Sequence, residues 1–136
     1  CGYESIYSKK NQNRLTVGKV EISGDKDLNK KIISQIPIDL NNKNNKVLVI
    51  DTQKQLESVS KDKAGNTKIY NLTIISNVSL KDKKKIINSK NFISSFSYNN
   101  ISNKFDLEQY RRNIEQNLTA KIAEEISMYF VSINDN

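Results

Sequence analysis

Residues 70–80 read YNLTIISNVSL, and this stretch decides the fold of the chain. Tyr70, Leu72, Ile74, Val78 and Leu80 occupy even positions, in a run that only Ser76 interrupts. A period of two places all of these side chains on one face of a β-strand. The stretch therefore predicts a strand that buries one face against other elements of secondary structure.

Two further strands are predicted beside this one. Val47 to about Lys61 begins as an apolar run, and the turn residues of Lys61–Asn66 (KDKAGN) connect it to the first stretch as a hairpin. On the other side, the lysine-rich segment Lys81–Lys85 is typical of a solvated turn. Four apolar residues after it again occupy even positions and are expected in the core: Ile86, Phe92, Phe96 and Tyr98. The three strands form an antiparallel meander.

The residues before the meander predict a strand and a short helix. Arg14–Ser23 alternates in hydropathy except at Gly18, which indicates a bulge or an edge. Asp25 or Asp27 can cap a helix in which Leu28, Ile32 and Ile36 recur every four residues until Pro37 ends it. A polar loop over 38–46 then leads back to the sheet, so the first strand should lie parallel to the second.

A long helix is predicted at the C-terminal end, after a polar loop over 99–104. Asp106 and Gln109 have the spacing of a capping box. The apolar residues recur at steps of three and four and form one stripe: Leu107, Tyr110, Ile114, Leu118, Ile122, Ile126 and Tyr129. This stripe supplies most of the apolar surface that can cover the sheet.

The order of elements defines the fold class. Strand, helix, three strands and helix (β-α-β-β-β-α) predict an α+β fold with a mixed four-stranded sheet and two helices packed on one face. A length of 136 residues is that of one domain, which we place at residues 14–133.

The composition restricts the function. The net charge of +7 favours anionic partners such as nucleic acid, anionic lipid or lipopolysaccharide, although an AT-rich genome also enriches a protein in Lys, Asn and Ile. Histidine is absent and Cys1 is the only cysteine, so the usual nucleophile–base pairs and zinc sites have no ligands. The carboxylates are scattered among lysines. We therefore expect no enzymatic activity, no metal site and no cofactor.

Cys1 is the candidate site of lipid attachment. Bacterial lipoproteins begin, after cleavage of their signal peptide, with a cysteine that carries the lipid, and Cys1-Gly2 fits this pattern. Gly2, in place of the Asp that retains lipoproteins in the inner membrane, favours the outer membrane. Residues 1–13 would then be a lipidated N-terminal tether. The alternative is that the sequence begins at a cysteine by chance.

Three features together resemble the lipopolysaccharide-assembly lipoprotein family LptE: the opening Cys1-Gly2-Tyr3, the order of elements, and the hairpin sequence KAGNTKIY at 63–70. The sequence FDLEQ at 105–109 is also similar to the start of the family's long helix. The resemblance implies that the protein lies inside an LptD-like outer-membrane barrel, on its periplasmic side. It also implies that Lys63 and Lys104 bind lipopolysaccharide.

Two other functions remain open. An auxiliary lipoprotein of a lipid transporter, or a pilotin-like chaperone, would share the anchor, the size and the fold. A basic nucleic-acid-binding module would need no anchor, but its lysines would be interleaved with exposed aromatic residues. The aromatic residues of the predicted strands instead fall on apolar faces, so we expect no nucleic-acid partner.

Overall fold

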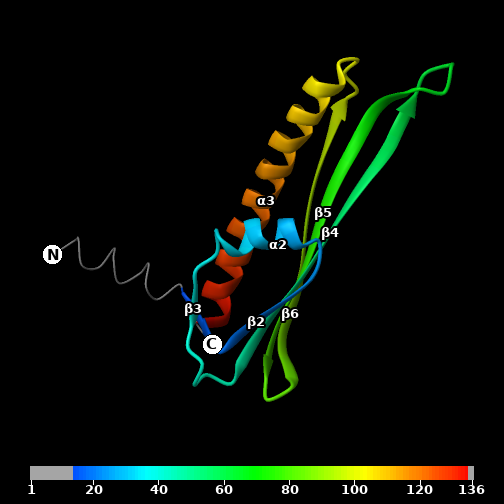
Figure 1. Ribbon diagram of the computed structural model, residues 1–136. Helices are drawn as coiled ribbons and strands as arrows, with labels where there is room; N and C mark the ends of the chain where they lie inside the picture. The colour runs from blue at the N-terminus through cyan, green and yellow to red at the C-terminus, as the bar shows by residue number, and fades with distance from the viewer. Residues whose placement is uncertain (1–13, 135–136) are drawn as a thin grey trace.

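A mixed four-stranded sheet is the centre of the fold in the computed structural model, which describes residues 14–134 (Figure 1). Its strand order is β2-β4-β5-β6, with β2 spanning Lys19–Gly24, β4 Lys46–Lys61, β5 Thr67–Asp82 and β6 Lys85–Asn99. The strand pair β2–β4 is parallel, whereas β4–β5 and β5–β6 are antiparallel. The predicted meander and the parallel crossover are therefore confirmed.

Both helices lie on the same face of this sheet, as predicted (Figure 1). The short helix α2 spans Lys26–Ile33 and the long helix α3 spans Lys104–Asn134. The strands bury alternate residues toward the helices, such as Leu48, Leu72 and Ile74, while α3 buries Ile122 and Ile126 completely. The fold class predicted from the sequence is correct.

The prediction of one continuous first strand over 14–23 is wrong. The chain breaks at Gly18 into β1 (Leu15–Val17) and β2, which belong to different sheets. A side chain at Gly18 would collide with the backbone carbonyl oxygen of Asn44, so only glycine permits this close approach. The irregularity that indicated a bulge is a change of sheet.

The loop predicted over 38–46 contains a third strand. Residues Ile38–Leu40 form β3, which pairs in parallel with β1 as a separate two-stranded sheet. The guanidinium of Arg14 reinforces this pairing by donating to the Asp39 carboxylate at 2.8 Å and to the Ile38 carbonyl at 3.0 Å. A strand of three residues is too short to show a recognisable alternation in hydropathy, so the sequence did not predict β3.

The helix ends differ in detail from the prediction. Asp25, rather than Asp27, caps α2 by accepting a hydrogen bond from the Leu28 amide at 3.0 Å, and the helix ends at Ile33, before Pro37. Asn103 caps α3, because its side chain accepts from the amides of Phe105 and Asp106 at 2.9 and 3.2 Å. The predicted Asp106–Gln109 capping box is therefore wrong.

Ser76, which interrupts the alternation of β5, is fully buried in a polar network. The Thr52 hydroxyl lies 3.1 Å from the Ser76 hydroxyl and donates to the Asn29 side-chain oxygen at 2.6 Å. Asn29 in turn donates to the carbonyl of Ser23 at 2.7 Å. These hydrogen bonds connect α2 to the centre of the sheet, so the polar residue does not weaken the core.

The predicted core is wrong at three aromatic or aliphatic positions. Phe96 and Ile86 are 48% and 61% exposed, because β6 is an edge strand and the helices do not cover it along its whole length. Tyr110 is 39% exposed, and its ring meets the Tyr98 ring in an edge-to-face contact. The sequence prediction also missed Phe130, which is completely buried.

The β5–β6 turn has an unusual backbone for its sequence. Lys83 and Lys84 connect the paired residues Asp82 and Lys85 and have φ angles of 53° and 72°. A two-residue hairpin with two positive φ angles strongly prefers Asn-Gly, because other side chains are strained there. The protein therefore places two lysines where they cost stability.

Candidate functional site

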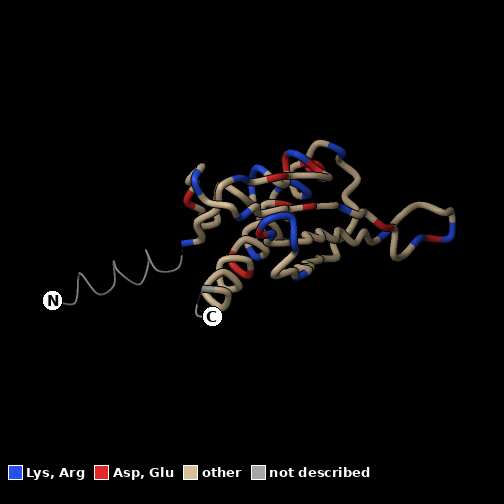
Figure 2. Tube along the Cα trace, turned by 90° about the horizontal axis from the view of Figure 1, so that it is seen from below, with Lys and Arg blue, Asp and Glu red and all other residues tan. Residues whose placement is uncertain are grey.

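The tip of the β4–β5 hairpin lies at the same end of the molecule as the start of α3 and stands to one side of that helix (Figure 1). Asp62 closes its turn. The Asp62 carboxylate accepts hydrogen bonds from the amides of Ala64 and Asn66, both at 2.9 Å, and Gly65 supplies the positive φ of 89° that the turn needs. With this carboxylate directed at the backbone, Lys63 projects into solvent from the turn. Figure 2 shows the charged tip standing apart from the rest of the chain.

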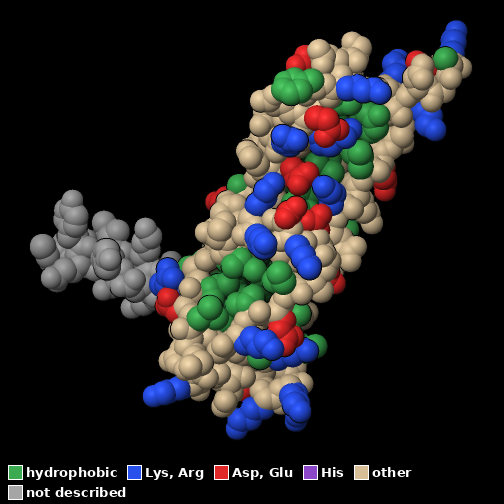
Figure 3. Space-filling view, in the orientation of Figure 1, with side chains coloured by type: hydrophobic (Ala, Val, Ile, Leu, Met, Phe, Trp, Pro, Cys, Tyr) green, Lys and Arg blue, Asp and Glu red, His purple; other side chains and the backbone are tan. Residues whose placement is uncertain are grey.

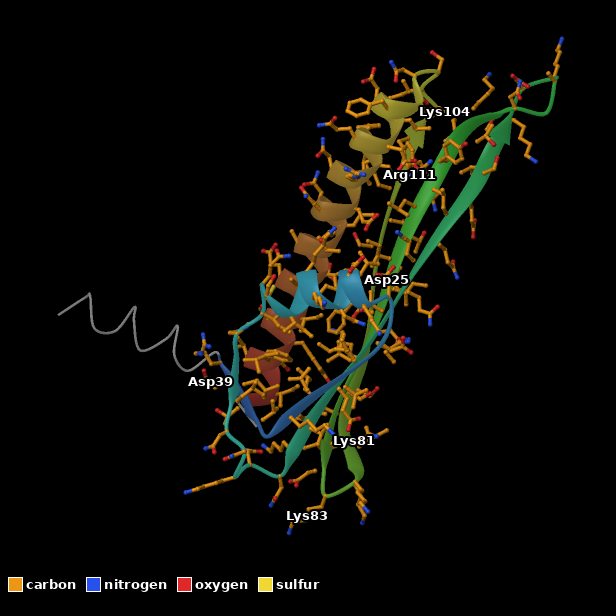
Figure 4. All side chains as sticks on the ribbon, in the orientation of Figure 1. Asp25, Asp39, Lys81, Lys83, Lys104 and Arg111 are labelled. Carbon is orange, nitrogen blue, oxygen red and sulfur yellow. The ribbon has the colours of Figure 1, made fainter. Side chains whose placement is uncertain are left out.

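Lys104 lies at the same end of the molecule, at the first turn of α3 (Figure 4). The loop before it is fixed to the base of the hairpin, since the Asn100 amide donates to the Lys68 carbonyl and the Asn100 side chain to the Thr67 carbonyl, both at 2.8 Å. The fold thus places at one end of the molecule two lysines that are far apart in the sequence.

A hollow of about 610 Å³ lies between the base of the hairpin and the loop before α3. Its lining comes from both of them and includes Asp62, Lys68, Asn100 and Ser102. Lys63 follows Asp62 directly, and Lys104 comes two residues after Ser102. Amides, hydroxyls and ammonium groups around such a hollow can bind an anionic, hydroxyl-rich ligand.

Neither Lys63 nor Lys104 has a carboxylate within 4.0 Å among residues 14–134. Both side chains are exposed. Their charges are therefore available to a ligand without breaking an ion pair.

Arg111 attaches α3 to the sheet just below this hollow, and the sequence analysis missed it (Figure 4). Its guanidinium stacks on the rings of Tyr70 and Tyr98, donates to the Tyr98 hydroxyl at 2.6 Å, and donates to Glu108 at 2.9 Å. Desolvation by burial lowers the pKa of Arg111, but the Tyr98 hydrogen bond and nearby charges outweigh it and raise the pKa overall. Arg111 therefore stays cationic and holds the two sides of the site in place. In the sequence, the one indication of this role is that Arg111 directly follows Tyr110, a member of the predicted apolar stripe.

The face of the sheet that the helices leave uncovered is mainly polar on β5 and β6, where Ile75 and Ile93 are apolar members. Strand β4 adds the carboxylates of Asp51 and Glu57 to the same face. From Asn71 to Ser79 every second residue of β5 belongs to this face, and none of them is ionisable. Hydroxyls and amides form hydrogen bonds across it, such as the one from Ser97 to Asn71 at 3.0 Å and the contact between Ser79 and Ser89 at 3.2 Å. Such a face is suited to contact with another polar protein surface.

Cys1 and the predicted tether over 1–13 lie outside the described residues. None of the described helices is long and apolar enough to cross a membrane. Within residues 14–134 no three His, Cys, Asp or Glu side chains gather as a possible metal site.

The fold is one that several bacterial lipoproteins share. Rare lipoprotein B from Shewanella oneidensis has a TM-score of 0.68 at 13% identity, over 87% of this chain and 97% of that one. A minor lipoprotein from Acinetobacter baumannii has a TM-score of 0.63 at 12% identity, over 87% and 93%. A putative lipoprotein from Caulobacter crescentus has a TM-score of 0.59 at 10% identity, over 91% of each chain. No family model and no curated protein matches the sequence.

Proposed function

We propose that this chain is a non-enzymatic outer-membrane lipoprotein that assists lipopolysaccharide transport and assembly, as the partner and plug of an LptD-like barrel. Cys1 is its lipid-attachment site, and Lys63 and Lys104 bind the lipopolysaccharide. The single observation that carries the proposal is the placement of both lysines, unpaired, at one end of a fold shared with bacterial lipoproteins.

Lipopolysaccharide has the chemistry that this end of the molecule suits. Its phosphates would accept from the ammonium groups of Lys63 and Lys104, and its sugar hydroxyls would hydrogen bond with amides such as that of Asn100. The Asp62 hydrogen bonds in the hairpin tip and the Arg111 contacts on α3 fix the backbone segments that carry the two lysines, which lowers the entropy cost of complex formation.

The uncovered sheet face supports the role of a plug. The interior of an outer-membrane barrel is polar, so a protein seated inside it needs a polar surface with few charges to desolvate. Asn71, Thr73, Ser95 and Ser97 give this character to the part of the face on β5 and β6 that lies toward the hairpin tip.

The binding site is tested by charge reversal. The double variant Lys63→Glu/Lys104→Glu is expected to bind purified lipopolysaccharide at least about tenfold more weakly, because each lost charge-assisted hydrogen bond costs about 1.5–3 kcal/mol. The measurement is a titration with fluorescently labelled lipopolysaccharide at 0.15 M salt.

The matched control is Lys30→Glu/Lys121→Glu, which changes the net charge equally at exposed positions on α2 and α3. This control should weaken binding only about twofold to threefold, since it affects only screened, long-range attraction. Equal losses in the two double variants would contradict the assignment of Lys63 and Lys104.

A further inference from the structure

The end of the molecule opposite the hairpin tip carries a second, denser group of lysines, here called the lysine pole (Figure 3). Its members come from the β3–β4 connection and from the β5–β6 turn: Lys43, Lys46, Lys81, Lys83, Lys84 and Lys85. The two segments line one hollow of about 440 Å³, to which Lys43, Lys46 and Lys83 contribute. From the sequence alone, Lys81–Lys85 is predicted only as a solvated turn.

The charges of the lysine pole are not compensated. Asp82 is the one acidic residue that lines the hollow with these lysines, and no lysine of the pole has a carboxylate within 4.0 Å in the described part of the chain. The strand register places Lys46 and Lys85 on either side of Asp82, so its single charge faces two lysines. The pole therefore has a strong positive field.

Two exposed isoleucines accompany these lysines. Ile86 and Ile87 follow Lys85 directly and are 61% and 48% exposed. An exposed aliphatic pair beside a cluster of lysines is the pattern of a surface that enters the headgroup region of an anionic bilayer. Nucleic acid would be favoured by exposed aromatic residues, but Phe96, Phe105 and Tyr110 lie in the half of the molecule toward the hairpin tip.

The backbone of the turn gives an independent indication. Lys83 and Lys84 both have positive φ angles in a turn that would be more stable with Asn-Gly. Residues kept in a strained conformation are enriched where function requires them. Here the strain keeps two ammonium groups at the extreme end of the molecule, where Figure 4 shows Lys83.

We propose that the lysine pole is a membrane-contact surface that binds a bilayer of anionic phospholipid, with the lysines at the phosphate groups and Ile86 and Ile87 at the level of the upper acyl chains. This inference goes beyond the proposed function, and it does not depend on lipopolysaccharide or on a barrel partner. The contact would orient the domain on the membrane, with the hairpin tip directed away from that bilayer.

The test uses the full chain with Cys1→Ser, so that no lipid anchor contributes, and vesicles that contain no lipopolysaccharide. This protein should sediment with vesicles of phosphatidylglycerol and phosphatidylcholine, but not with phosphatidylcholine alone, and the binding should fall steeply as salt is raised. Equal binding to the uncharged vesicles would overturn the proposal.

The decisive variant is Lys83→Asn/Lys84→Gly. It should bind the anionic vesicles about 25-fold more weakly, at about fivefold per lysine. Because it also removes the strained backbone, its Tm should rise by about 3 °C, so weaker binding cannot be attributed to unfolding. The control Lys30→Gln/Lys121→Gln removes the same charge elsewhere and should change binding less than about threefold. Equal losses in both variants would reject the lysine pole.

A second pair of variants tests the isoleucines and separates membrane from nucleic acid. Ile86→Ser should weaken vesicle binding about fivefold, whereas Ile93→Ser, 59% exposed further along the same strand, should have little effect. A duplex oligonucleotide serves as the competing anion. If the protein bound this duplex more tightly than the vesicles, and Ile86→Ser changed neither, the pole would be a nucleic-acid surface and the proposal would fail.

Discussion

Replacing Ile122 by Asp is expected to lower the free energy of unfolding of the domain by several kcal/mol. Ile122 is completely buried on the face of α3 that covers the sheet. An aspartate there would lose the apolar contacts and would leave a carboxylate without a partner in the core. The total stability of a domain of this size is about 5–15 kcal/mol, so this cost is a large share of it. Urea denaturation followed by circular dichroism measures the change.

The matched control is Met128→Asp on the same helix. Met128 is 67% exposed, so the same new charge should cost only about 1 kcal/mol or less, mainly through helix propensity. If the two variants were equally stable, α3 would not provide the core of the domain.

The second large effect is expected at Cys1. The Cys1→Ser variant should move from the membrane fraction to the soluble periplasmic fraction, because only the thiol can carry the lipid and two or more acyl chains make anchoring effectively permanent. The domain should remain folded, since the sheet and helices over 14–134 are complete without this residue.

The fractionation is done in cells that lack the barrel partner and after a wash with 1 M salt. At this concentration the Debye length is about 3 Å, so electrostatic contact through the lysine pole is screened and only a lipid anchor can retain the protein. A Cys1→Ser protein that still remained with the outer membrane after this wash would contradict the assignment of Cys1.

The sequence predicted those parts of the fold in which many residues repeat one pattern. Strand β5 and helix α3 are long enough for a period of two or of three to four to be clear, and both were found. The sequence prediction fails where a single tertiary contact decides the local structure. The break at Gly18 depends on the carbonyl of Asn44, which lies far along the chain, and no local pattern contains that information.

The other differences between prediction and structure arise at the edge of the sheet and at the helix N-cap. Phe96 has the parity of a core residue, but its strand is at the edge of the sheet, and strand order is not visible in hydropathy alternation. Asn103 caps α3 in place of the Asp106 box because both Asn and Asp can cap, and spacing alone does not distinguish them.

The candidate site was predicted only in part. The family resemblance indicated Lys63 and Lys104, but the hollow between their segments depends on the Asn100 hydrogen bonds that fix the loop to the hairpin. Arg111 was missed because a charged residue beside an apolar stripe is usually solvated, and because its tyrosine partners lie on two different strands, β5 and β6, that only the fold brings together. The lysine pole was missed because its two segments meet only in the folded chain.

The association with a barrel partner tests the central claim most directly. The lipidated full chain is purified in mild detergent from cross-linked envelopes, and the copurifying proteins are identified by mass spectrometry. We expect one large outer-membrane β-barrel protein in equal amount, cross-linked to residues of the uncovered sheet face such as Thr73 and Ser95, together with lipopolysaccharide. Recovery of an inner-membrane lipid transporter or a secretin in its place would contradict the account and would favour an auxiliary lipoprotein or a pilotin-like chaperone.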